Sequence, residues 1–175
     1  MLITKVTFLT RMSMHFGTLM GLLWILKFSF LPLGFTYPML QLMFLLLTAM
    51  VPIIGYMWSL KYRDVYCFGN ITFRHAFIYN MMMYSFAILL TAVAHLIYFA
   101  KIDNGYLIEK YTEVLQSAKA SLPAEMIAEA DKINEAFELL ASMSAREITF
   151  ELMSQNFFYC TLIAIPASFI LRKSK

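Results

Sequence analysis

The chain has 175 residues, of which 61% are hydrophobic and 14% are charged, against about 25% charged in an ordinary soluble domain. A soluble domain of this size has too little interior to hide so much apolar surface, so a soluble enzyme or binding module is excluded and a membrane is the expected solvent. The net charge of +3 comes from scattered basic pairs without a sustained basic face, so nucleic acid is not an expected partner.

Four apolar runs are long enough for transmembrane helices, which need about 20 residues each. They lie at about 12–31, 38–60, 76–100 and 152–171. Because a backbone in hydrocarbon must satisfy its own hydrogen bonds, all four runs are predicted to be helices. A turn between the first two is predicted near Pro32, Gly34 and Pro38. The expected fold is all-α, a polytopic membrane protein in which residues 1–175 form a single membrane domain.

Basic residues are concentrated in three short flanks, and this bias predicts the orientation. Segments 1–11, 61–75 and 172–175 carry eight Lys and Arg residues, whereas the turn at 32–37 has none and segment 101–153 has five. Such residues are retained on the cytoplasmic side. Both termini are therefore expected in the cytoplasm. The first run lacks an A-x-A-like cleavage site, so we expect a retained span and not a signal peptide.

The insert between the third and fourth spans holds ten of the eleven acidic residues, yet it is predicted to be folded. Two apolar stripes have helical spacing: Leu107, Ile108, Tyr111, Leu115 and Ala118, then Met126, Ile127, Ala130, Ile133, Phe137, Leu140 and Ala141. Pro123 marks the break between them, and Ser144 with Glu147 matches a capping box that starts a helix near Ala145. Residues 101–151 are therefore predicted to form an extracytoplasmic helical hairpin, whose stripes pack on each other, on lipid or on a partner.

Two ionisable residues inside the spans are candidate functional groups, since charge in a membrane is costly. Lys27 and His95 both lie near the expected outer end of a span, where they would line one outward-facing polar pocket. The simpler interpretation is a lysine that extends to the interface and a histidine that hydrogen-bonds a neighbouring helix. Gly17 and Gly21 form a G-x-x-x-G pattern, which is a candidate helix-packing face.

No catalytic, metal-binding or cofactor-binding motif occurs. The three histidines lack metal-ligand spacing, and the two cysteines suggest neither a disulfide framework nor a CxxC site. Glutamates at i and i+4 in the insert lack the spacing of a calcium loop and are expected to form a solvated acidic face. No catalytic residue, metal or cofactor is therefore expected.

The chain resembles the small bacterial inner-membrane proteins grouped as domain of unknown function 4199. The resemblance covers most of the chain. It is carried by the four-span layout, the loop motifs at 61–64 and 69–73, the exit from the third span at 98–103, and the helical insert. It implies the bacterial inner membrane as the location, and it implies no activity.

Three hypotheses for function follow. The leading one is an accessory or scaffold subunit of an envelope complex, which contacts membrane lipid and binds an envelope protein through residues 101–151 or through the Gly17 and Gly21 face. The second is a small transporter or channel component, for which the intramembrane polar side chains are Gln41, Asn80, Thr91 and Asn156. The third is a membrane enzyme that uses an outward-facing pocket. Homo-oligomerisation is left open.

Overall fold

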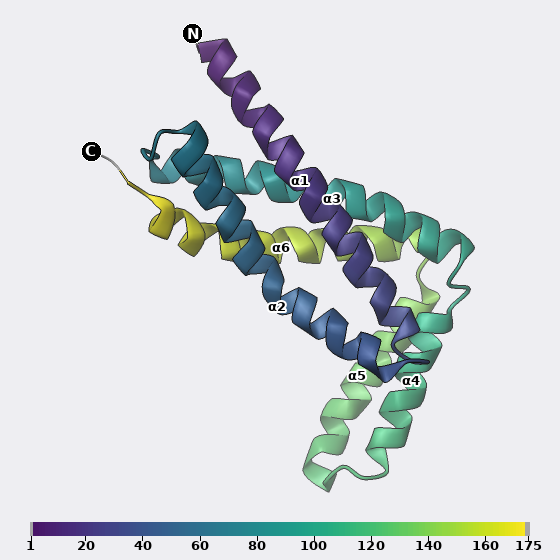
Figure 1. The fold of residues 1–175 in the computed structure, drawn as a ribbon. Coiled ribbons are helices and arrows are strands. Elements are labelled where there is room, and N and C mark those ends of the chain that lie inside the picture. Colours follow the sequence, from purple (N-terminus) through teal and green to yellow (C-terminus); the bar gives the residue numbers. More distant parts are fainter. Residues whose placement is uncertain (1, 174–175) are drawn as a thin grey trace. The chain divides into compact units, whose positions relative to one another are not determined.

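The computed structural model describes residues 2–173 (Figure 1). Met1 and the end of the basic tail, Ser174 and Lys175, lie outside the described residues. The elements in chain order are α1 (Leu2–Leu33), α2 (Pro38–Lys61), the π-helical turn η1 (Tyr62–Tyr66), α3 (Phe73–Lys101), α4 (Tyr106–Lys119), α5 (Ala124–Ser142) and α6 (Ala145–Leu171). The chain divides into two compact units. We call them the bundle unit (Met1–Val93 and Leu152–Lys175) and the hairpin unit (Ala94–Glu151).

The prediction of an all-helical fold with four candidate membrane-spanning helices is confirmed. In the described part, the helical stretches Thr7–Leu33, Pro38–Tyr66, Phe73–Lys101 and Ala145–Leu171 are long and apolar enough to cross a membrane. The expected turn proves shorter, because α1 continues through Pro32. Proline removes one N–H donor but has a helical φ, so the last turn of a helix tolerates it.

The first two spans form an antiparallel helical pair joined by a short turn (Figure 1). The helix α1 ends at Leu33, and the N–H of the next residue, Gly34, donates to the Phe30 carbonyl at 2.9 Å. Pro38 then occupies the first turn of α2, where its missing N–H would have no intrahelical partner. The predicted turn between these two spans is therefore present.

Three basic segments of the chain gather at the opposite end of the bundle unit. Phe8 on α1 contacts the ring of Tyr66, with centroids 5.7 Å apart. Ile71, in the loop before α3, exchanges two backbone hydrogen bonds with Lys173 after α6, at 2.9 and 3.0 Å. The N-terminal part of α1, the α2–α3 loop and the chain beyond α6 therefore share one end of the bundle.

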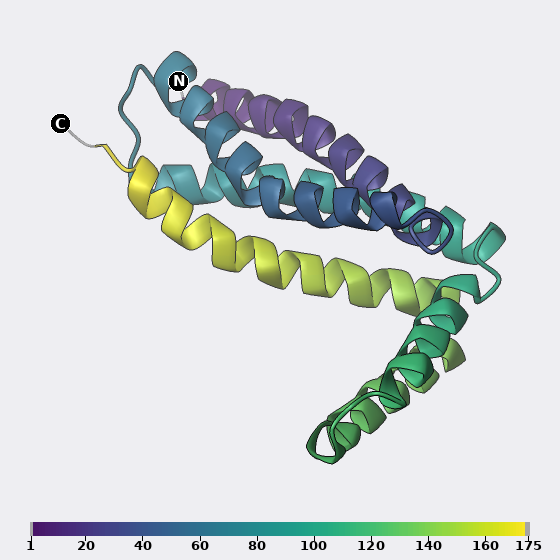
Figure 2. The same cartoon turned by 60° about the horizontal axis from the view of Figure 1, so that its bottom comes forward.

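The hairpin unit contains the predicted helical hairpin, in which α4 and α5 run antiparallel (Figure 2). The rings of Tyr111 and Phe137 stack with centroids 5.9 Å apart. Nearer the tip, Gln116 donates to Asn134 at 3.1 Å and Lys119 donates to Asp131 at 2.7 Å. These contacts show that the two apolar stripes pack partly on each other.

The second stripe is only partly covered by this packing. Ala130 is buried and Phe137 is half-buried, but Met126, Ile127 and Ile133 stay exposed. One helix of α4's length covers only one side of α5, so a broad apolar face is left partly uncovered.

The predicted capping box at the start of α6 is confirmed. The Ser144 N–H donates to the Glu147 carboxylate at 2.7 Å, and the Glu147 N–H donates back to the Ser144 hydroxyl at 3.4 Å. The helix begins at Ala145 and continues without interruption to Leu171. The side of the membrane on which the hairpin lies stays a prediction.

Candidate functional site

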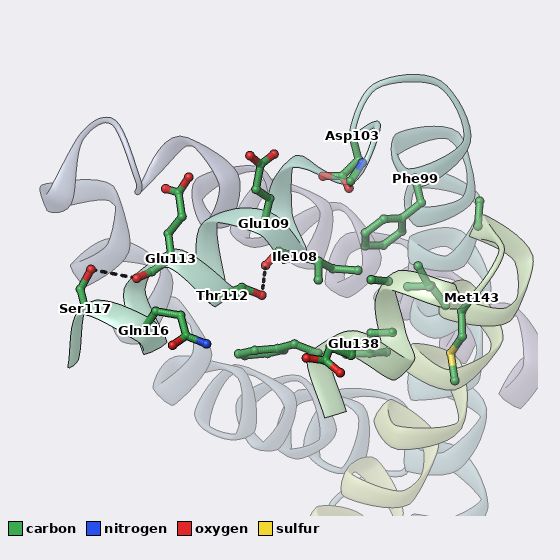
Figure 3. Close-up of a pocket in the computed structure, with 16 residues that line it drawn as sticks. Phe99, Asp103, Ile108, Glu109, Thr112, Glu113, Gln116, Ser117, Glu138 and Met143 are labelled. Atoms are coloured by element: carbon green, nitrogen blue, oxygen red, sulfur yellow. Dashed lines mark hydrogen bonds between the residues drawn. The ribbon is translucent and has the colours of Figure 1, made fainter. Parts of the chain in front are cut away.

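An open groove of about 810 Å³ lies within the hairpin unit (Figure 3). It runs between α4 and α5 and reaches the first turn of α6. Its apolar lining residues include Phe99, Ile108, Phe137, Leu140, Met143 and Ile148. Ligand sites are typically concave and apolar with a few placed polar groups, and this groove has that character.

Asp103 lines the groove next to the start of α4. Its side chain is 5% exposed and accepts hydrogen bonds from the backbone N–H groups of Gly105, at 3.2 Å, and Leu107, at 3.1 Å. These groups belong to the N-terminal turn of α4, where helical N–H donors lack intrahelical partners. Asn104 and Gly105 have positive φ angles of 45° and 86°, which turn the chain from α3 into α4. Asp103 is therefore a structural cap in a wall of the groove.

Three further carboxylates line the groove at its rim. Figure 3 shows Glu109 and Glu113 on α4 and Glu138 on α5. Lys110 donates to Glu113 at 2.6 Å, and this bond raises the pKa of the lysine. Asn134 donates to Glu138 at 2.7 Å. Glu109 makes no ion pair with any residue that the structure describes.

Within the described chain, no lysine or arginine lines the groove. The rim is therefore acidic while the floor is apolar. This combination complements a ligand that is both cationic and apolar.

An exposed apolar seam continues on α5 beyond the groove. Met126 and Ile133 are 53% and 47% exposed and lie seven residues apart, on one helical face. Together with Ile127, they are the residues of the predicted second stripe that stay exposed.

The structure places the two predicted pocket residues in different units. Lys27 belongs to the bundle unit, where its ammonium lies 5.9 Å from the ring centroid of Trp24 and 5.4 Å from that of Phe44. His95 belongs to the hairpin unit, is 6% exposed, and packs edge-on against Phe99 with centroids 6.3 Å apart. A shared pocket of Lys27 and His95 stays a prediction.

Two of the four polar side chains considered for a transport path have hydrogen-bond partners inside the bundle unit. Asn80 is buried and hydrogen-bonded to Ser59 and Ser168. Thr91 donates to the Ala87 carbonyl of its own helix at 2.8 Å. Gln41 lies beside Gly34 at the α1–α2 turn, and Asn156 is half-buried on α6.

A cluster that the sequence did not reveal lies at the basic end of the bundle. The rings of Tyr62 and Tyr79 stack with centroids 3.8 Å apart, and the Tyr62 hydroxyl hydrogen-bonds His75 at 3.0 Å. Both tyrosines are almost completely buried. Tyr62 belongs to η1, whereas His75 and Tyr79 belong to α3. The contact between these two elements depends on how the chain folds, so no sequence pattern indicated it.

The glycine pair forms a close contact inside the chain. A Cβ atom at Gly17 would lie 2.5 Å from the Met83 carbonyl oxygen and 2.7 Å from the Phe86 Cβ. One at Gly21 would lie 2.9 Å from a Leu90 methyl carbon. The Gly17 and Gly21 face of α1 is therefore covered by α3, and it is not available to another protein.

The described residues contain no group of three His, Cys, Asp or Glu side chains that would hold a metal ion. A family model described as "Protein of unknown function (DUF4199)" matches residues 15–173. Neither a curated protein nor a solved structure gives a significant match.

Proposed function

We propose that this chain, which belongs to the DUF4199 family of proteins of unknown function, is a membrane-anchored accessory subunit whose α4–α5 hairpin docks a partner. The partner would present a cationic amphipathic segment. The observation that carries the proposal is the groove of the hairpin unit, with its apolar floor and acidic rim. Four apolar helices suggest a membrane location for the chain, so the hairpin would act as the chain's polar docking module.

Charge complementarity supports a cationic occupant. Segment 101–153 has ten acidic and five basic residues, and none of the described residues lining the groove is basic. A cationic segment would neutralise the rim, whereas an acidic one would be repelled. Helix-in-groove recognition uses apolar anchors spaced along one face of the bound helix, and the floor around Phe137 and Leu140 offers apolar contacts for such anchors.

Two other occupants fit less well. A second copy of the hairpin would place one acidic rim against another, which costs free energy through like-charge repulsion. Helices that lie on membrane surfaces usually have basic polar faces that attract anionic lipid, whereas the hairpin is acidic. These arguments favour a cationic protein segment over self-association or lipid.

The proposal includes an orientation. Phe8 with Tyr66, and Ile71 with Lys173, bring three basic segments to one end of the bundle unit. Basic flanks are retained in the cytoplasm. We therefore propose that this end is cytoplasmic, that the hairpin is extracytoplasmic, and, from the family resemblance, that the membrane is a bacterial inner membrane. The partner would then be another envelope protein.

A binding experiment with the full-length chain in a nonionic detergent tests the docking proposal. Two fluorescent synthetic amphipathic helices serve as probes. One has lysines on its polar face, and the other has glutamates at the same positions. We expect the lysine helix to bind with an affinity that falls as salt rises, and the glutamate helix not to bind.

A matched pair of variants locates the binding surface. The groove variant combines Glu109→Gln, Glu113→Gln and Glu138→Gln, and we expect it to weaken binding by about tenfold. The control variant combines Glu125→Gln, Glu129→Gln and Glu135→Gln. It removes the same charge from exposed residues outside the groove and is expected to bind almost normally. Equal losses in the two variants would show unspecific electrostatic attraction and contradict a docking groove.

A further inference from the structure

The basic end of the bundle unit carries cations that no described acidic side chain neutralises. The exposed ones, which we call the basic surface, are Arg11, Lys61, Arg74, Arg172 and Lys173. The ion pairs of the described chain include none of them. Arg63 differs, because its guanidinium donates to the Asp64 carboxylate at 2.7 and 3.2 Å. The basic surface is therefore open to an anionic ligand from outside the chain.

Contacts between chain segments bring these cations together. The Ile71 N–H donates to the Lys173 carbonyl at 2.9 Å and the Lys173 N–H donates back at 3.0 Å, so the α2–α3 loop lies beside the chain that follows α6 (Figure 2). The contact between the rings of Phe8 and Tyr66 places α1 beside η1. The cations of the four spans therefore belong to one surface.

The loop between η1 and α3 adds an exposed aromatic side chain to this surface. Phe68 is 88% exposed, the highest value among the large hydrophobic residues of the described chain. Its φ of 53° lies in the left-handed region, which bulky side chains rarely adopt. The Gly69 N–H donates to the Arg63 carbonyl at 3.0 Å, so the loop turns back on η1. An apolar ring displayed in this way is stabilised by an apolar environment that covers it.

The lengths of the spans place the basic surface at the level of lipid headgroups. The spans have 27 to 29 residues and are about 40–44 Å long, against about 30 Å for the hydrocarbon core and about 40–45 Å for the bilayer with its headgroups. Spans that are centred and upright therefore end in the headgroup layer. Arg74 and Arg172 adjoin the span ends at Phe73 and Leu171, and the long side chain of Lys61 can extend to the same level.

We propose that the basic surface binds anionic phospholipids of the leaflet that surrounds it, and that Phe68 inserts between their headgroups. Lysine and arginine near a membrane surface attract anionic lipid, and guanidinium groups donate paired hydrogen bonds to phosphate oxygens. Aromatic side chains insert at the boundary between headgroups and acyl chains. A free phosphate would neutralise the cations but leave the Phe68 ring uncovered, so the lipid fits better. This binding requires only a membrane location for the chain, and it depends neither on the hairpin groove nor on which side the basic end faces.

The test uses the purified full-length chain in a nonionic detergent. Its melting temperature is measured with phosphatidylglycerol, with phosphatidylcholine of the same acyl chains, and with inorganic phosphate. Native mass spectrometry counts the lipids that stay bound, with and without a glutamate-rich soluble peptide as a competitor. We expect phosphatidylglycerol to raise the melting temperature and to be retained in preference to phosphatidylcholine.

A matched pair of charge variants locates the lipid. The basic-surface variant combines Arg74→Gln, at the start of α3, with Lys173→Gln, after the end of α6. We expect it to bind phosphatidylglycerol about tenfold more weakly. The control variant combines Lys101→Gln and Arg146→Gln, which removes the same charge from exposed residues at the opposite ends of the same two helices. It should bind like the wild type.

Phe68→Asn separates the aromatic contribution from the charges. Asparagine adopts the left-handed region more readily than phenylalanine, so this variant should melt at the wild-type temperature or above it when no lipid is added. We expect its affinity for phosphatidylglycerol to fall about fivefold, because the apolar contact is lost.

Several results would overturn the proposal. Equal losses of binding in the two charge variants would show that the lipid is attracted by charge at any position. Equal retention of phosphatidylcholine would show that the negative charge of the lipid contributes nothing. A melting shift with inorganic phosphate and none with phosphatidylglycerol would assign the surface to a free anion, and displacement of the lipid by the glutamate-rich peptide would assign it to an acidic protein.

Discussion

Asn80 on α3 donates its side-chain amide to the Ser168 hydroxyl on α6 at 3.2 Å, and its carbonyl accepts a hydrogen bond from Ser59 on α2. All three side chains are at most 1% exposed. One amide therefore joins three of the four candidate spans. Polar bonds of this kind hold helices together in membranes, where there is little hydrophobic driving force between them. This geometry favours a structural role for Asn80 over a place in a transport path.

Asn80→Leu is expected to lower the free energy of unfolding by about 1–2 kcal/mol, since each interhelical bond contributes about 0.6 kcal/mol on average. The loss is bounded because Ser59 and Ser168 also donate to the Gly55 and Ala164 carbonyls of their own helices, at 2.8 and 2.6 Å. Unfolding in mixed micelles measures the change. Thr91→Val, whose hydroxyl bonds only its own helix, is the control. A similar loss of unfolding free energy in both variants would contradict a stabilising hydrogen-bond connection between the spans.

Gly17→Leu should disrupt the packing of α1 on α3. Even the Cβ atom of the new leucine would lie only 2.5 Å from the Met83 carbonyl oxygen. Because this oxygen belongs to the backbone, the clash can be relieved only if one of the two helices moves. We expect a loss of more than about 2 kcal/mol in the free energy of unfolding. Thr18→Leu introduces the same side chain at the next position, which is exposed, and should cost little. If Gly17→Leu were as stable as Thr18→Leu, the close contact with α3 would be disproved.

Asp103→Ala should loosen the first turn of α4. The carboxylate accepts hydrogen bonds from the Gly105 and Leu107 N–H groups, and losing a helix cap costs about 1 kcal/mol. Hydrogen exchange of the α4 amides is the measurement, and faster exchange is expected. Asp131→Ala removes an exposed carboxylate whose ion pair with Lys119 contributes little. Unchanged exchange in Asp103→Ala would show that the cap is dispensable.

Cysteine labelling tests the proposed orientation. In a Cys160→Ser background, a membrane-impermeant maleimide should label a Ser121→Cys variant at the hairpin tip in intact cells. Native Cys67 should react only after the membrane is permeabilised. Burial raises the pKa of the Cys67 thiol, so less thiolate is present at neutral pH, and its labelling should be slow and accelerate as pH rises. Labelling of Cys67 in intact cells, with Ser121→Cys protected, would reverse the orientation.

Much of the fold could be predicted from the sequence, because the strongest signals were local. Long apolar runs predicted the four spans, and the Ser144 and Glu147 pair predicted where α6 begins. The boundaries were less accurate. Pro32 was expected in a turn yet belongs to α1, and the chain after Lys61 continues as a π-helical turn where a loop was expected. Proline and polar residues weaken helices without forbidding them, so packing decides where a helix ends.

The sites were harder to predict, because they depend on which helices meet. The spacing of Gly17 and Gly21 predicted close approach but not the partner, which is α3. Lys27 was singled out because a charged side chain is costly in a membrane. Nothing in the sequence indicated that the indole N–H of the neighbouring Trp24 lacks a hydrogen-bond partner in the described chain. The apolar stripes of the insert predicted a hairpin, but not the groove between its helices or the exposure of Ile133.

Photo-cross-linking in native membranes tests the docking account most directly. A benzophenone amino acid replaces Gln116, which lines the groove, or Glu135, which is exposed on α5 and does not line it. Mass spectrometry then identifies the attached segment. We expect the groove position, and not position 135, to attach to a basic amphipathic segment of another envelope protein. Attachment of both positions to the same molecules, or of the groove position only to lipid, to an acidic segment or to a second copy of this chain, would contradict docking in the groove.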